Sequence, residues 1–215
     1  MVPVSEEIYA LKEIWDLDFD KRPLAHFYHK KPFLIFEELP ITPLLNAIRF
    51  ESQKARLRHG GLDERVRKTI LHPSTPQIEE RFSAILEPLR PEIERFFRIR
   101  LLGGTKLQIL DYPEGGHYLR HADNASELVR DGRVVGYKEV APQRRLTTLL
   151  FLGGEFTGGE LEFCHLRTKD GKRVIIKPRA GMIVVFPSHG LFAHRVNPVR
   201  SGRRLAAVKW WDGVC

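Results

Sequence analysis

Two histidines and an aspartate lie close together in the stretch HYLRHADN, which spans residues 117–124. Side chains two residues apart point to the same face of a β-strand, so His121 and Asp123 would project together. A neutral imidazole beside a carboxylate can form half of a metal site or a hydrogen-bonded dyad, and such a pair also occurs without any chemical role. His117 would share the face of His121, and we interpret it as a polar residue at the rim rather than a ligand.

A third candidate ligand is His194, in the later stretch LFAHRVNPV. In an apolar strand an imidazole must find a partner, or its polar atoms stay unsatisfied. A neighbouring hydrogen-bonding group could be that partner, but the order of the residues favours a metal. An H-x-D pair followed several strands later by one more histidine is the sequence form of the facial triad, which leaves open coordination positions on Fe(II) and is typical of non-haem oxygenases. His189, in PSHGLFAH, is interpreted as a loop residue.

An iron centre of this kind needs a cosubstrate, and a dicarboxylate cosubstrate needs a cation to hold it. Arg204 lies ten residues after His194. A turn at PVRSG would bring the last strand beside the strand of His194. Arg203 is the alternative cation, because a register slip of one residue would exchange the two faces of the last strand. Alternation predicts that its inward face is made of Arg204, Ala206, Val208 and Trp210.

The composition is that of an ordinary soluble protein. The chain has 215 residues, of which 42% are hydrophobic and 29% charged, and this length suits one core rather than two. No apolar run approaches the roughly 20 residues of a membrane span, and residues 1–20 lack the basic and apolar regions of a secretory signal. Because Cys164 and Cys215 are the only cysteines, we expect no disulfide framework and predict a cytoplasmic protein without membrane contact.

The net charge of +8 allows an acidic partner, nucleic acid included. The basic residues are scattered along the chain, however, and do not form one long run. A solvated, slightly basic surface is therefore the preferred explanation of the charge.

The first hundred residues are predicted to be mainly helical. Residues 5–15 begin with a serine and two acids that suit an N-cap and a first turn. Residues 42–57 begin with Thr-Pro and carry apolar side chains along one face. Residues 75–97 are periodic, and two prolines are expected to divide that helix. The segment 58–75 is rich in glycine and charge and is predicted to be a mobile surface loop.

Short β-rich runs follow one another after residue 103, with Gly, Pro, Asn and Asp clustered between them. The eight runs are TKLQILDY, GHYLRHAD, RRLTTLLFL, GELEF, KRVIIKP, GMIVVFP, LFAHRVN and RLAAVKWW. Eight short strands without helices between them predict an α+β protein whose C-terminal part is an antiparallel jelly roll, or double-stranded β-helix. We expect a single domain over residues 1–215, with residues 1–102 as a mainly helical support that buttresses the jelly-roll core of residues 103–215.

These residues together give the chain a family likeness. It resembles the Fe(II)- and 2-oxoglutarate-dependent dioxygenases, and among them the prolyl 4-hydroxylase group, over residues 104–212. The resemblance is carried by LQILDYPEGGHYLRHADN, RRLTTLLFLGGEFTGGELEF, IIKPRAGMIVVFP and HRVNPVRSGRR. The stretch YPEGGHYLRHADN in particular is similar to the corresponding strand of the animal oxygen-sensing prolyl hydroxylases.

The resemblance implies roles for individual residues. His121, Asp123 and His194 would bind Fe(II), in agreement with the triad pattern. Arg204, in the pattern H-x-V-x-P-V-x-x-G-x-R, would pair with the distal carboxylate of 2-oxoglutarate. The intact carboxylate at position 123 favours hydroxylation over halogenation, since related halogenases have a non-ligating residue there.

Further residues would line the cosubstrate site. Tyr112, just before PEGG, matches a tyrosine that hydrogen-bonds 2-oxoglutarate, and a partly buried strand aromatic without that role is the alternative. Where the oxygen sensors have a second tyrosine the chain has Phe151, which removes one hydroxyl. Thr147, on the same strand, and Trp210, on the face of Arg204, are the remaining candidates for contact with the cosubstrate.

The implied chemistry is the oxidative decarboxylation of 2-oxoglutarate with O₂ to succinate and CO₂, coupled to hydroxylation of an unactivated C–H bond. Ascorbate is expected as a reductant. The leading hypothesis for the substrate is a prolyl residue of a peptide or protein, on family likeness alone. The segments 60–73 and 124–143 could act as lids over the site, and Asp131-Gly132 in the second is predicted to form a hairpin turn.

Three other functions stay open. The substrate could be a free amino acid or small metabolite. Oxidative demethylation of nucleic acid would suit the net charge, although RRLAAVKWW lacks the asparagine of the signature that those enzymes carry. The fold could also be a metal-free binding module, but such a module has no reason to keep the four residues His121, Asp123, His194 and Arg204.

Overall fold

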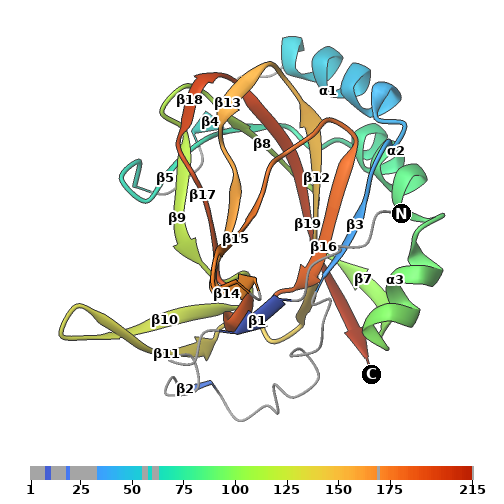
Figure 1. Cartoon of the computed structure of the whole chain (residues 1–215). Helices are drawn as coiled ribbons and strands as arrows, with labels where there is room; N and C mark the ends of the chain where they lie inside the picture. The colour runs from blue at the N-terminus through green and yellow to red at the C-terminus, as the bar shows by residue number, and fades with distance from the viewer. Residues whose placement is uncertain are drawn as a thin grey trace.

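The computed structural model describes residues 8–10, 18–19, 33–54, 58–59, 63–168 and 170–214. Within these residues two largely antiparallel sheets face each other, and the helices cover the outer face of the larger sheet (Figure 1). The predicted α+β jelly roll with buttressing helices is therefore confirmed. The single domain over residues 1–215, with its change of character near residue 102, stays a prediction.

The larger sheet has eight strands, in the order β3-β16-β12-β19-β8-β6-β4 with β7 paired to β19. Strand β12 is apolar along most of its length because both of its faces are buried, one against the second sheet and one against the helices. The strand bounds are Leu34–Phe36 (β3), Arg58–His59 (β4), Ile70–His72 (β6), Arg100–Gly104 (β7), Gln108–Tyr112 (β8), Arg144–Gly153 (β12), Met182–Pro187 (β16) and Arg204–Val214 (β19).

The smaller sheet has six strands, in the order β1-β14-β17-β9-β5 with β15 paired to β14. Its strand bounds are Ile8–Ala10 (β1), Arg67–Lys68 (β5), His117–His121 (β9), Leu161–Thr168 (β14), Arg173–Ile176 (β15) and His194–Val196 (β17). Side chains from both sheets fill the space between them, among them Phe163, Phe186 and Val208. This inner space holds the site described below.

Two small sheets extend from the sandwich. One pairs β10 with β11 and β11 with β2, and the other pairs β13 with β18. Their bounds are Asp18–Phe19 (β2), Ala125–Arg130 (β10), Arg133–Glu139 (β11), Phe156–Gly158 (β13) and Val199–Gly202 (β18). The turn between β10 and β11 has positive φ at Asp131 (50°) and Gly132 (71°), as a two-residue hairpin turn requires. The predicted hairpin is confirmed, and it projects from one end of the sandwich (Figure 1).

Three α-helices and one 3-10 turn lie among the described residues, namely Thr42–Lys54 (α1), Pro76–Leu86 (α2), Arg90–Phe97 (α3) and Gly190–Phe192 (η3). The hydroxyl of Thr75 accepts a hydrogen bond from the Ile78 amide and so caps α2. The helix ends before Pro88, and α3 begins with Pro91 in its first turn, so the prolines divide the segment as predicted. No helix of the described residues is both long and apolar enough to span a bilayer.

Two local predictions were wrong. In the segment 5–15, predicted as helix, Ile8–Ala10 is a strand that pairs with β14, and the rest of the segment lies outside the described residues. The predicted loop 58–75 contains β4, β5 and β6, which extend the edges of the two sheets. The free backbone N–H and C=O groups of a sheet edge favour an added strand, and this tertiary pairing outweighs local sequence preference.

Candidate metal and cosubstrate site

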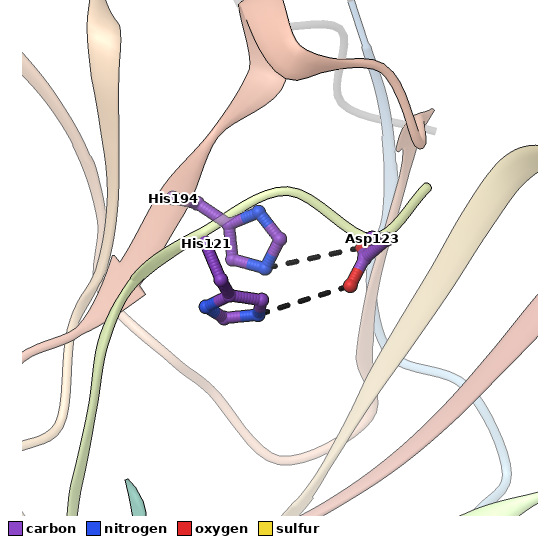
Figure 2. Close-up of side chains that lie close together, drawn as sticks. All are labelled: His121, Asp123 and His194. Carbon is purple, nitrogen blue, oxygen red and sulfur yellow. Dashed lines mark ion pairs between the residues drawn. The ribbon is translucent and has the colours of Figure 1, made fainter. Parts of the chain in front are cut away.

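His121, Asp123 and His194 lie together between the two sheets, as predicted. His121 ends β9, Asp123 follows it by two residues, and His194 begins β17 directly opposite His121 in the sheet. One ligand atom from each residue lies within 4.8 Å of the others. The Nε2 atoms of His121 and His194 are 3.8 and 4.0 Å from the two carboxylate oxygens of Asp123, as the dashed lines of Figure 2 show.

The two imidazoles are held in the orientation that a metal ligand needs. The Nδ1 atom of His121 is 2.9 Å from the carbonyl oxygen of Leu119, and that of His194 is 3.0 Å from the carbonyl oxygen of Phe192. A carbonyl only accepts, so each Nδ1 carries the proton and each Nε2 keeps a free lone pair. Burial, and then the neighbouring His194, lowers the pKa of His121 to about 3, so this ring is neutral near pH 7.

Asp123 is held by two side chains of strand β12. The hydroxyl of Thr147, on β12, donates to Asp123 Oδ2 at 2.7 Å and lies 2.9 Å from the hydroxyl of Ser188. The guanidinium of Arg144 donates to the backbone oxygen of Asp123 at 2.9 Å. Thr147 was predicted as a cosubstrate contact; its hydroxyl orients the carboxylate, and a contact with the cosubstrate stays a prediction.

A β-bulge changes which residues of β9 face the site. His194 pairs with His121, but Val196 pairs with Tyr118, so three residue steps on β9 oppose two on β17. Tyr118 therefore stacks on the His121 ring, with ring centroids 3.5 Å apart. His117, which strict alternation placed on the face of His121, instead lies near the carbonyl oxygens of Gly115 and Arg65. These contacts agree with the predicted position of His117 at the rim. The prediction that His117 shares a strand face with His121 was wrong.

Arg204 begins β19 and is buried in the same cavity, with 1% of its surface exposed. Its guanidinium carbon lies 4.7 Å from the centre of the Tyr112 ring and 5.0 Å from that of Phe151. Among the described residues, none of its three guanidinium nitrogens has a hydrogen-bond partner. Burial lowers the pKa of Arg204, and Tyr112 opposes this shift. A buried cation without a partner is costly, so this position calls for an anionic ligand.

Arg203, the alternative cation, points the other way. It pairs with the Asp111 carboxylate through contacts of 2.5 and 3.2 Å on the opposite face of the sheet. Burial raises the pKa of Asp111, but hydrogen bonds from His72 and Arg203 outweigh burial, and the net pKa is lowered. Of the two arginines, only Arg204 lines the cavity.

Of the other predicted cosubstrate contacts, Tyr112 and Trp210 line the same cavity, and Phe151 lies beside the Arg204 guanidinium without lining it. Tyr112 and Phe151 are both 1% exposed, and burial raises the pKa of the Tyr112 phenol. Trp210 lines the cavity with its indole nitrogen unpartnered among the described residues. The cavity measures about 250 Å³, which is small and allows only a compact ligand.

Four polar residues that line the cavity were not predicted: Arg67, Gln108, Tyr118 and Arg144. Arg67 lies in the segment expected to be a loop, and the bulge in β9 hides Tyr118 from any pattern of alternation. Gln108 and Arg144 lie on strands that were predicted, at positions two residues or more from the candidate site residues. Gln108 could have been found by extending the inward alternation of β8 from Tyr112.

Comparisons with known proteins agree with this geometry. The model of the 2OG-Fe(II) oxygenase superfamily matches residues 107–212. A putative prolyl 4-hydroxylase of Acanthamoeba polyphaga mimivirus is 27% identical over 135 residues, which are 59% of this chain and 52% of the relative. A PKHD-type hydroxylase of Nitrosomonas europaea is 37% identical over 95 residues, which are 43% of this chain and 37% of the relative. The aligned region thus spans about half of the first relative and less of the second.

Solved structures share the fold. A prolyl hydroxylase from Trichoplax adhaerens, in complex with a hypoxia inducible factor peptide fragment, superposes with a TM-score of 0.65 at 21% identity, over 84% of this chain and 83% of that chain. A prolyl-4-hydroxylase from Pseudomonas putida gives a TM-score of 0.58 at 22% identity, over 84% of this chain and 92% of that chain. Residues 107–212, which carry the His-Asp-His cluster and the buried arginine, therefore belong to the 2OG-Fe(II) oxygenase superfamily.

Proposed function

We propose that this protein is an Fe(II)- and 2-oxoglutarate-dependent dioxygenase that hydroxylates a C–H bond. One observation supports this most strongly. Two imidazoles with free Nε2 atoms and one carboxylate converge within 4.8 Å, in the same cavity as a buried arginine without a partner. The two imidazoles and the carboxylate have the donor set of a facial triad. The buried arginine suits the distal carboxylate of 2-oxoglutarate.

His121, Asp123 and His194 are the proposed iron ligands. The carbonyl oxygens that hold both Nδ1–H groups fix the rings, and Thr147 fixes the carboxylate. Such outer contacts orient ligands before the metal binds and raise their affinity for it. The donors present therefore fit Fe(II), and a set of three protein ligands would leave coordination positions open for the cosubstrate and O₂.

Arg204 is the proposed partner of the distal carboxylate of 2-oxoglutarate. The Tyr112 phenol lies beside the guanidinium and is proposed to donate a second hydrogen bond to that cosubstrate. Phe151 supplies only an apolar ring beside the Arg204 guanidinium, so it offers the cosubstrate no hydrogen bond. Trp210 is proposed to close the cavity from the last strand.

When bound, Fe(II) and 2-oxoglutarate supply the oxidising chemistry, in which O₂ is consumed, 2-oxoglutarate becomes succinate and CO₂, and the substrate gains a hydroxyl group. The protein side chains hold these groups in position, and the apolar cluster around them excludes bulk water. Ascorbate is proposed as the external reductant. A cytoplasmic location stays a prediction.

The substrate is proposed to be a prolyl residue of a peptide or protein. Support comes from the prolyl hydroxylases among the relatives and from the peptide named in the Trichoplax adhaerens complex. A free amino acid or small metabolite is the second candidate, because the cavity of about 250 Å³ must hold the cosubstrate as well. Nucleic acid is the least favoured partner, since the basic residues form no continuous run.

Release of succinate without added substrate tests the reaction. We expect the wild-type protein with Fe(II), ascorbate and 2-oxoglutarate to release succinate slowly, and His121→Ala to release none. His117→Ala is the matched control, because that histidine lies on the same strand but does not line the cavity. Wild-type protein that neither releases succinate nor binds 2-oxoglutarate in an iron-dependent manner would contradict the oxygenase proposal and favour a metal-free binding module.

Substrate trapping tests the prolyl assignment. His121→Ala protein is incubated with a cell extract, the captured molecules are identified, and each is then treated with wild-type enzyme. Mass spectrometry should find a product that carries one added oxygen atom on a prolyl residue. Oxidation only of nucleic acid, or only of a small metabolite, would overturn the prolyl proposal and leave the oxygenase proposal intact.

A further inference from the structure

The segment from β5 to β6 places a second arginine in the cavity. Strand β5 pairs with β9 of the smaller sheet, and β6, one residue later, pairs with β8 of the larger sheet. The segment therefore crosses from one sheet to the other and closes the open edge between them. Arg67 lies on this crossing segment and lines the cavity.

Arg67 is held in place but has a free donor group. It is 9% exposed, its Nε donates to the Thr69 hydroxyl at 3.0 Å, and its guanidinium carbon lies 5.1 Å from the centre of the Tyr118 ring. Because Tyr118 stacks on His121, this guanidinium sits one aromatic layer away from a proposed iron ligand. Its terminal nitrogen Nη2 has no hydrogen-bond partner among the described residues.

Arg144 lines the cavity from the larger sheet, and like Arg67 it is held by one hydrogen bond and an aromatic ring while one of its nitrogens has no partner among the described residues. Its Nη1 group donates to the backbone oxygen of Asp123, and its guanidinium carbon lies 4.3 Å from the centre of the Trp210 ring. Its Nε atom has no partner among the described residues. Gln108 and Trp210, which line the same cavity, each present one further unpartnered polar atom.

The charge of the cavity is not balanced. Asp123 is its only acidic lining residue among those described, and three arginines line it. Arginines outside the cavity pair with carboxylates, for example Arg195 with Glu162 and Arg203 with Asp111. If the proposed function holds, the charges of Fe(II), Asp123, 2-oxoglutarate and Arg204 cancel one another. The two remaining guanidinium groups, of Arg67 and Arg144, would then face the substrate without a counter-charge.

We propose that Arg67 and Arg144 form a carboxylate-binding subsite, so that the substrate carries a carboxylate close to the C–H bond that is oxidised. This inference rests on the proposed function and narrows its substrate class. A guanidinium with a free N–H edge binds a carboxylate through charge-assisted hydrogen bonds, and the aromatic rings beneath both groups hold them in place. The carboxylate can belong to a free acid or to an acidic residue next to the target in a peptide.

The test is a titration followed by NMR of the arginine Nε–H groups. The protein is saturated with 2-oxoglutarate and with Zn(II), which is redox-inert and prevents turnover, and acetate or its neutral isostere acetamide is added. We expect acetate to shift the Arg67 and Arg144 signals saturably, and acetamide to leave them unchanged. Arg67→Gln should weaken acetate binding at least about tenfold, and Arg67→Lys should weaken it less because the charge is kept. Arg200→Gln, at an exposed arginine outside the cavity, should bind acetate like wild type.

A second titration identifies the source of the carboxylate. Tighter binding of N-acetylproline than of N-acetylprolinamide indicates a free acid, and tighter binding of acetyl-Glu-Pro-amide than of acetyl-Gln-Pro-amide indicates an acidic residue in a peptide. The absence of a saturable acetate shift at Arg67 and Arg144, or equal shifts with acetamide, overturns the subsite. Succinate release by wild type is measured separately, so the oxygenase proposal and the subsite can fail independently of each other.

Discussion

The inner and outer faces of the larger sheet use the same residue types for opposite purposes. Arg203 and Arg204 are consecutive, yet Arg203 pairs with Asp111 on the outer face while Arg204 is buried on the inner face without a partner among the described residues. Thr147 and Thr148 are also consecutive. Thr147 orients Asp123 on the inner face, whereas Thr148 donates to the Lys209 carbonyl and accepts from the Trp211 indole on the outer face.

The difference is one of hydrogen-bond satisfaction. On the outer face, Asp111 accepts from Arg203 and contacts His72, whose other ring nitrogen is 2.6 Å from the Ser52 hydroxyl. Among the described residues, most buried polar side-chain atoms without a partner belong instead to residues that line the inner cavity. Satisfied groups stabilise the fold, and unsatisfied ones store binding energy for a ligand.

Replacement of the two arginines gives the largest expected contrast. Arg204→Met should reduce the affinity for 2-oxoglutarate at least about 100-fold, because it removes a buried charge partner. Its free energy of unfolding without ligand should be no lower than that of wild type, since an unpaired buried charge is lost. Arg203→Met should leave the affinity almost unchanged. Calorimetry under anaerobic conditions with Fe(II) and urea denaturation measure the two effects, and similar affinity losses in both variants would contradict the comparison.

The two threonines separate metal binding from stability. Thr147→Val removes the hydroxyl that holds Asp123 and should lower the affinity for Fe(II) about 10- to 100-fold, while Thr147→Ser should restore it. Thr148→Val should leave iron affinity unchanged and cost about 1–2 kcal/mol of unfolding free energy, because the Trp211 indole loses its acceptor. Anaerobic competition with a metal chelator gives the affinities. A loss of iron affinity in Thr148→Val equal to that in Thr147→Val would show that the faces are not independent.

Asp111→Asn tests the outer cluster alone. We expect a loss of about 2 kcal/mol in unfolding free energy, because the variant removes the charge that Arg203 and His72 contact. Arg203 contributes the smaller part of this loss, since its side chain is half-exposed and solvent screens the ion pair. The affinity for 2-oxoglutarate should stay within the error of the wild-type value. Urea denaturation and calorimetry check both statements. A matched fall in affinity would mean that the outer cluster supports the site directly.

The smallest expected effect is the pH dependence of the stability that the Asp111 carboxylate contributes. The lowered pKa of Asp111 means that its carboxylate stabilises the fold above its unfolded value of about 3.9, and that this contribution is lost as pH falls through the folded value. The stability difference between wild type and Asp111→Asn should therefore be full at pH 6 and shrink toward pH 3. Denaturation at several pH values measures it, and a difference that stays constant would exclude the carboxylate as its origin.

Sequence reasoning found those parts of the fold and site whose signals are local. Alternation and turn residues located each of the eight predicted core strands, and the order H-x-D, then His, with Arg204 ten residues later, identified side chains that the structure brings into one cavity. It missed Arg67 because short edge strands carry no periodic signal of their own. It misplaced His117 relative to His121 because a single extra residue in β9 reverses the alternation.

The sequence by itself determined which residue types are available for the site and on which strands they lie, because the period of a strand and the chemistry of a ligand are both local properties. Only the tertiary structure decided that Arg204 faces inward while Arg203 faces Asp111. It also decided that the segment from β5 to β6 crosses from one sheet edge to the other and so places Arg67 in the cavity. The choice between adjacent residues depends on strand register and on bulges, which are set by packing between the sheets.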